Sequence, residues 1–220
     1  MAPEPIDPLH RLRDEACKEA YEYFDRHIRK LVRRANGQIN PFGPGLDDND
    51  VDAFRHAYVS GVFTQDFGEK VANYLGLANE YWPGGQYSHS VSPGSRNMDL
   101  WNNKVGRRYG KTIRSRKTLL KAIHNALKKG ELILNPKDPR EFTGAKSPPD
   151  KLSKPIVAVA KSKSGRNEIF YDIEKRVVLS REDLVAKIEM GFDPGYSVKI
   201  IRGIETPVSK RDGRIANNIG

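Results

Sequence analysis

An aspartate, a histidine and a serine recur four residues apart in the segment Asp52-Ala-Phe-Arg-His56-Ala-Tyr-Val-Ser60. Four residues make about one turn of a helix, so these side chains are expected along one helical face. A carboxylate one turn before an imidazole can accept its N–H, which fixes the tautomer and raises the basicity of the ring. The spacing therefore predicts catalytic roles for both groups, with His56 as a general base that Asp52 orients. A surface Asp–His pair without a role is the alternative.

A second polar stripe lies in the segment Asn97-Met-Asp99-Leu-Trp-Asn102-Asn103-Lys-Val-Gly106-Arg107. Its polar positions follow the spacing of one helical face, although asparagine, aspartate and glycine all weaken a helix. The face is therefore expected to have a purpose, and Gly106 would let another backbone or a ligand approach closely. A buried hydrogen-bond network between two helices is the alternative. We assign a catalytic role to Asp99 and substrate binding to Arg55, Asn102, Asn103 and Arg107.

Glu80 lies between the two stripes and completes the candidate catalytic set. A divalent cation is one candidate cofactor, with His56, Glu80 and Asp99 as ligands and Asn103 as a neutral oxygen donor. Without a metal, the same residues would act as base, orienter and electrostatic stabiliser. His89, in the loop 82–96, is a further candidate that could swing over the site, although a loop histidine without a role is the favoured alternative. The sequence has no HExxH, GxSxG, P-loop or CxxC motif that would identify a reaction.

Helical periodicity places both stripes in the first part of the chain. A first helix is predicted over residues 8–35, between a cap at Asp7 and a stop at Asn36-Gly37. A second is predicted from residues 47–49 to about 64. The third is predicted to end at Gly76 and the fourth to begin near Asn97. The fifth is predicted over 117–129, with a stop at Gly130.

The period changes to that of β-strands after residue 155. Strands are predicted at residues 156–160, 168–173, 176–179 and 196–201. Ser180 and Asp183 have the spacing of a capping box and predict a short helix that ends at Met190. We therefore predict an α+β protein: a mostly helical, candidate catalytic domain (1–134), a linker (135–154), and a small β-rich module with one helix and a mobile tail (155–220).

The positive charge is concentrated in one stretch. The formal net charge is +10, and residues 104–129 contain ten lysines and arginines without an aspartate or glutamate. Such a run predicts an anionic partner, either nucleic acid or a lipid headgroup, whereas the alternative is a solvated helix face. No apolar run reaches the roughly 20 residues of a transmembrane segment. A cleavable signal peptide is not apparent, and Cys17 alone allows neither an intramolecular disulfide nor a multi-cysteine zinc site.

Three ordered motifs resemble an uncharacterised, toxin-associated bacterial family of helical domains. They are D-x-x-R-H-A-Y from Asp52, A-x-E from Ala78, and M-D-L-x-N-N-x-x-G from Met98, and together they cover about residues 47–110. Asn79 and Trp101 stand where the family pattern has histidines, so a metal site that uses those two histidines is not expected. The segment from residue 156 onward is similar to a second small bacterial module. The resemblance implies a protein that is secreted or delivered into a target cell.

These observations favour an enzyme over a binding protein. We expect an antibacterial effector toxin, a hydrolase of a phosphodiester or lipid-linked anionic substrate, that is cytoplasmic in the producer and exported without a cleavable signal peptide. An immunity protein or a secretion-apparatus protein is an expected partner. The alternative is a non-catalytic, basic nucleic-acid-binding module, whose binding would weaken steeply with salt. A membrane-surface role for the helix 117–129 ranks last, because its apolar face is needed for the core.

Overall fold

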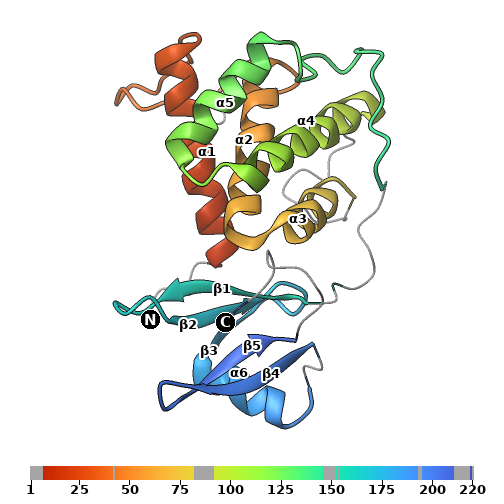
Figure 1. The fold of residues 1–220 in the computed structure, drawn as a ribbon. Helices are drawn as coiled ribbons and strands as arrows, with labels where there is room; N and C mark the ends of the chain where they lie inside the picture. The colour runs from red at the N-terminus through yellow and green to blue at the C-terminus, as the bar shows by residue number, and fades with distance from the viewer. Residues whose placement is uncertain are drawn as a thin grey trace. The chain divides into compact units, whose positions relative to one another are not determined.

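The computed structural model describes residues 7–41, 43–81, 92–145, 152, 154–192, 195–210 and 219. The chain forms two compact units (Figure 1). One is Leu12–Pro148, and the other combines Met1–Arg11 with Pro149–Gly220. The predicted α+β class is confirmed, because helices precede small antiparallel sheets with one helix. Among the described residues, no helix combines the length and the apolar character that crossing a membrane requires.

The helical unit is built around one central helix. The helices are α1 (Pro8–His27), α2 (Asp50–Phe67), α3 (Glu69–Tyr81), α4 (Pro93–Thr112) and α5 (Arg116–Lys128). α2 packs against α3, α4 and α5, and apolar residues such as Phe54, Ala57, Tyr58 and Val62 are fully buried along it. A helix buried on several sides is apolar nearly all round. Asp52 and Ser60, which are buried on the same helix, are therefore exceptional.

Glycines bring α2 and α4 unusually close together. A Cβ atom at Gly106 would lie 1.9 Å from the carbonyl oxygen of Ala57, and one at Gly110 would lie 2.3 Å from that of Gly61. Any side chain at these positions of α4 would thus collide with the backbone of α2. The close approach predicted for Gly106 is that of the α2 backbone. The crossing fixes the positions of the side chains that the two helices present to each other.

Three predicted helix ends need correction. α1 ends at His27 instead of residue 35, because the chain turns back through a bridge between Arg33 and Ile39, with Gly37 at φ 79°. α3 continues through Gly76 to Tyr81, since a glycine weakens a helix without having to end it. α4 begins at Pro93, four residues before Asn97, because Ser92 caps it by accepting from the N–H of Ser95.

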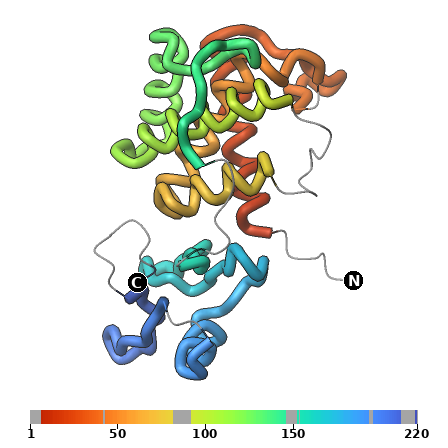
Figure 2. Tube along the Cα trace, turned by 90° about the vertical axis from the view of Figure 1, so that its right-hand side faces the viewer, coloured from red at the N-terminus to blue at the C-terminus, as the bar shows by residue number. Residues whose placement is uncertain are grey.

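The stretch after α5 packs on the helices (Figure 2). Gly130, at φ 70°, follows the helix end as predicted. Leu132 and Ile133 are buried in the helical core, and the Asn97 amide bonds the carbonyl of Arg140 and the N–H of Phe142 at 2.8 and 2.7 Å. The helical unit therefore extends beyond residue 134, where the sequence analysis placed its end.

The second unit contains a three-stranded antiparallel sheet, a helix and a hairpin. The elements are β1 (Ile156–Lys161), β2 (Asn167–Asp172), β3 (Val177–Ser180), α6 (Arg181–Glu189), β4 (Tyr196–Ile201) and β5 (Ile204–Ser209). The capping box of Ser180 and Asp183 is confirmed. β5 was not predicted. It pairs with β4 through a tight turn in which Arg202 and Gly203 both have positive φ. The predicted mobile tail lies almost wholly outside the described residues.

Candidate functional site

α2 and α4 bring three of the predicted catalytic side chains together. Nε2 of His56 lies 3.4 Å from Oδ1 of Asp52 and 3.5 Å from Oδ1 of Asp99. One nitrogen or oxygen atom from each of the three residues lies within 4.8 Å of the others. The two polar stripes read from the sequence thus meet at the helix crossing. The three atoms can all accept a hydrogen bond or bind a cation.

Asp52 is the carboxylate that the protein keeps ionised. It is buried, and burial raises its pKa, but the neighbouring His56 and the guanidinium of Arg55 outweigh burial and hold the pKa below its usual value. Nη2 of Arg55 donates to Oδ1 of Asp52. The backbone N–H of Asp48 donates to Oδ2 at 2.8 Å. Asp52 therefore supplies a fixed negative charge at the start of α2.

His56 is held in its neutral form. Burial lowers its pKa to about 4, and the positive charge of Arg55 acts in the same direction, against Asp52 and a hydrogen bond with Asn103. Nη2 of Arg55 lies 3.2 Å from Nε2 of the ring. Because a guanidinium only donates, Nε2 is the unprotonated nitrogen in this arrangement. The ring thus offers a lone pair at neutral pH, as a general base or a metal ligand must.

Asp99 is a buried carboxylate without the partners that such a group normally has. Its Oδ1 is buried and has no hydrogen-bond partner among the described residues. Burial raises its pKa well above the usual value, and the negative charges of Asp52 and Glu80 raise it further. Buried polar groups in folded proteins are nearly always paired, and leaving one unpaired is costly. The protein therefore tolerates an unfavourable group where two helices meet.

Glu80 lies outside this group of three, whereas Asn103 contacts it through a hydrogen bond with His56. Glu80, on α3, is buried, which raises its pKa, and its Oε1 accepts from the amide of Asn79 at 2.9 Å. Asn79 thus holds Glu80 in place. The predicted metal set of His56, Glu80 and Asp99 therefore needs correction: Asp52, not Glu80, offers the third close ligand atom.

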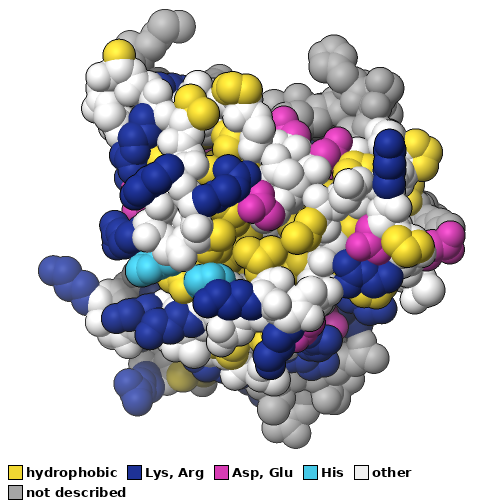
Figure 3. Space-filling view, turned by 90° about the horizontal axis from the view of Figure 1, so that it is seen from above, with side chains coloured by type: hydrophobic (Ala, Val, Ile, Leu, Met, Phe, Trp, Pro, Cys, Tyr) yellow, Lys and Arg dark blue, Asp and Glu magenta, His cyan; other side chains and the backbone are white. Residues whose placement is uncertain are grey.

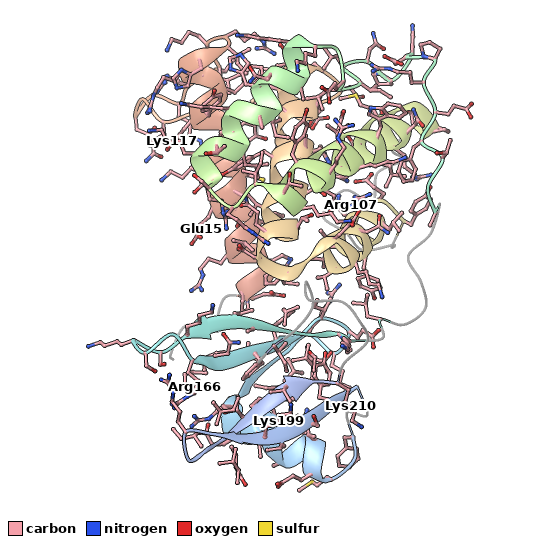
Figure 4. All side chains as sticks on the ribbon, in the orientation of Figure 1. Glu15, Arg107, Lys117, Arg166, Lys199 and Lys210 are labelled. Atoms are coloured by element: carbon pink, nitrogen blue, oxygen red, sulfur yellow. The ribbon has the colours of Figure 1, made fainter. Side chains whose placement is uncertain are left out.

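Two predicted substrate-binding residues have other surroundings. The side chain of Asn102 binds the backbone of Ile133 at both ends of its amide, donating to the carbonyl at 2.8 Å and accepting from the N–H at 2.9 Å. Its role is therefore structural. This agrees with the alternative interpretation of the stripe, in which its polar residues form a buried hydrogen-bond network. Arg107 is buried beside α3, next to Gly76 (Figure 4), and burial lowers its pKa to about 10. It lies two turns along α4 from Asp99.

Asp48 is a contributor that sequence reasoning missed. It lies just before Asn49, the residue that caps α2, and has a φ of 55°. Few residues other than glycine adopt this conformation, although aspartate is among those that do. The turn aims the N–H of Asp48 at Asp52. The run Asp47-Asp48-Asn49-Asp50 was the available signal, since such residues favour tight turns before helices. His89 lies outside the described residues.

The basic run 104–129 is partly neutralised in the folded protein. Acidic residues elsewhere in the unit pair with it: Glu131 binds Arg108, Glu69 binds Lys111 at 2.8 Å, and Asp66 binds Arg116 at 2.8 Å. Figure 3 shows Lys and Arg side chains over much of this end of the molecule, with Asp and Glu side chains among them. The run of basic residues in the sequence therefore does not form a continuous basic surface in the folded protein.

Comparisons with known proteins bear on the helical unit. Neither a curated protein nor a solved structure matches the chain. Residues 10–131, more than half of the chain, match a family described as a domain of unknown function, DUF6973. The matched region includes all of α1 but its first two residues, all of α2 to α5 and every site residue described above. The chain belongs to the DUF6973 family.

Proposed function

We propose that the helical unit is a hydrolase that acts on an anionic, phosphate-containing or lipid-linked substrate at the crossing of α2 and α4. The observation that carries the proposal is Oδ1 of Asp99, which has no partner in the described part of the chain and lies buried 3.5 Å from the neutral nitrogen of His56. A buried polar group that the fold does not satisfy is expected to bind something from outside. Perturbed acids and bases that gather in one place are typical of catalytic sites.

The proposed chemistry is activation of a water molecule. The lone pair on Nε2 of His56 either takes a proton from the water or binds a cation that carries the water. The water oxygen forms a bond to the phosphorus or carbonyl carbon, and the leaving oxygen departs with a proton. Asp99, whose raised pKa favours its protonated form, can supply that proton. The guanidinium of Arg55 neutralises the negative charge that develops during attack.

An effector role belongs to the same proposal. The motif resemblance supports an antibacterial toxin that is made in the cytoplasm of the producer and delivered into a target cell. A toxin of this kind needs an immunity protein in the cell that makes it, so a dedicated inhibitor is the proposed partner. Hydrolysis of nucleic acid predicts toxicity in the target cytoplasm, and hydrolysis of a lipid-linked precursor predicts toxicity in the periplasm.

Expression in a bacterium, directed to the cytoplasm or to the periplasm, tests the proposal. His56→Ala and Asp99→Asn should abolish toxicity in the sensitive compartment while the proteins remain folded. Asp50→Asn is the matched control, because Asp50 lies on the same helix but pairs with Arg29 at the surface. It should remain toxic. Full toxicity of a folded His56→Ala protein would contradict the proposed hydrolase.

A nucleic-acid-binding module is the second candidate, favoured by the basic residues that remain exposed. Lys117, labelled in Figure 4, and Lys121 are exposed on α5. Reversing both charges should weaken nucleic-acid binding and reduce its dependence on salt, whereas His56→Ala should leave binding unchanged. The ion pairs of Arg108, Lys111 and Arg116 limit the charge available for this role. Salt-independent binding would remove this candidate.

A further inference from the structure

We propose that Asp52, His56 and Asp99 form a binding site for one first-row divalent cation such as Mn²⁺ or Zn²⁺. The site deepens the proposed function, which it would serve by activating water, but the binding is argued from geometry alone. The three residues come from two helices whose spacing the glycine contacts fix. Their polar atoms are therefore held in place by the backbone and not by hydrogen bonds to one another.

The distances fit the coordination of a small cation. Ligand atoms about 2.1 Å from a tetrahedrally coordinated metal are about 3.4 Å apart. Nε2 of His56 lies 3.4 Å from the Asp52 oxygen and 3.5 Å from the Asp99 oxygen. When Asp99 is ionised, all three atoms are hydrogen-bond acceptors, and a positive charge among them relieves their mutual repulsion. Oδ1 of Asp99 has no donor among the described residues, which leaves that position for a cation.

The alternatives to a metal are weaker on the observed contacts. A proton on Nε2 of His56 would satisfy both carboxylates, but Nη2 of Arg55 donates toward the same nitrogen from 3.2 Å, and the cation that we propose takes the place of this donor. Arg55 supplies a positive charge of its own to Asp52, yet no hydrogen bond joins it to Asp99 in the described structure. The buried Nε atom of Arg55 also has no partner among these residues. Arg55 thus neutralises the charge of Asp52 but not that of Asp99.

The ligand types narrow the class of metal. One imidazole and two carboxylates suit Mn²⁺, Fe²⁺ or Zn²⁺ better than Ca²⁺, which prefers six to eight oxygen ligands. Asn103 bonds the His56 side chain and so orients the ring, as second partners of metal-bound histidines commonly do. Glu80 lies outside the close set and its carboxylate accepts from Asn79. Glu80 is therefore not one of the proposed metal ligands.

Metal binding to the full-length, chelator-treated protein tests this site without any substrate. Free Mn²⁺ is followed by electron paramagnetic resonance and Zn²⁺ by titration calorimetry. The wild type should bind one equivalent, and Asp99→Asn and His56→Gln should each weaken binding by about tenfold or more. Asp50→Asn and Glu80→Gln should change affinity by less than about threefold. Circular dichroism of the metal-free variants checks that each is folded.

The possible outcomes separate this inference from the proposed function. No binding of Mn²⁺ or Zn²⁺ by the wild type, or equal binding by a folded Asp99→Asn protein, would overturn the metal site. The hydrolase would then remain, with His56 taking the proton itself. A tenfold loss in Glu80→Gln would overturn the ligand set, because the metal would then depend on α3. Loss of toxicity in the variants bears only on the hydrolase.

Discussion

Asp25 and Asp99 are both buried aspartates of the helical unit, and they have opposite surroundings. They are 5% and 8% exposed, respectively. Asp25 accepts from the N–H of Leu31 at 2.9 Å and from Arg33 at 2.6 Å, and Lys30 lies 3.3 Å away. The hydrogen bond from Leu31 and the two cations hold its pKa below the usual value. Asp99 has an unpaired oxygen and a raised pKa.

The comparison separates a structural carboxylate from a functional one. Asp25 ends a helix and fixes the turn that follows, so its charge contributes to folding. Asp99 contributes charge where the fold does not compensate it, which selection for stability alone would remove. The same residue type thus stabilises one region, where it lies near the surface and is paired, and destabilises the other, where it lies deep between two helices. We infer that the crossing of α2 and α4 near Asp99 is organised for binding.

Gly106→Ala should have the largest effect, because it separates the helices that hold Asp99 against His56. The new Cβ would lie 1.9 Å from the carbonyl oxygen of Ala57, so α4 must move. We expect a loss of about 3 kcal/mol or more in the free energy of unfolding, measured with urea. Gly130→Ala is not a suitable control, because Gly130 has a φ of 70°, a backbone conformation that is unfavourable for alanine. A stable, fully active Gly106→Ala protein would show that the close crossing is unnecessary.

Asp25→Asn should have the next largest effect on stability. The amide cannot compensate Arg33 and Lys30, so the substitution should lower the free energy of unfolding by about 2–3 kcal/mol at pH 7. Activity per folded molecule should not change, because Asp25 ends α1 and has no contact with Asp99 among the described residues. An Asp25→Asn protein as stable as the wild type would remove the contrast between the two aspartates.

His56 should make the metal-free protein sensitive to acid. The pKa of His56 is about 4 in the folded protein, against 6.5 for an ordinary histidine. Since the folded state binds the proton less readily, the stability that neutral His56 contributes above pH 6.5 is lost as the pH falls toward 4. We expect a loss of about 2–3 kcal/mol over this window. His56→Gln should lack this component, and identical pH profiles would contradict the assignment.

Local pattern was enough to predict the site's helices but not its surroundings. The i, i+4 spacing of Asp52 and His56, and the stripe that begins at Asp99, are properties of single helices and were read correctly as helical faces. The capping box at Ser180 is equally local. Because apolar faces pack together, two interrupted faces on neighbouring helices indicated that their polar groups would meet.

Such local patterns could not predict contacts between segments that are far apart in the sequence. Asn102 looked like a site residue, yet its partner is the backbone of Ile133, 31 residues later. The stretch that includes Phe142 looked like a linker because it is rich in proline and charge, whereas one asparagine side chain and one buried ring attach it to the helices. Glycine was also ambiguous: Gly76 continues a helix and Gly130 follows the end of one.

The stability of Asp99→Asn in metal-free buffer tests the central claim most directly. Asp99 has a raised pKa in the folded state, so the unfolded protein gives up the proton more readily and stability falls as the pH rises above about 4. Replacing the carboxylate by an amide removes this penalty. Urea unfolding at pH 7.5 should show Asp99→Asn to be about 1–2 kcal/mol more stable than the wild type, with the difference shrinking toward pH 4. An Asp99→Asn protein less stable than the wild type at pH 7.5 would show that Asp99, like Asp25, serves the fold.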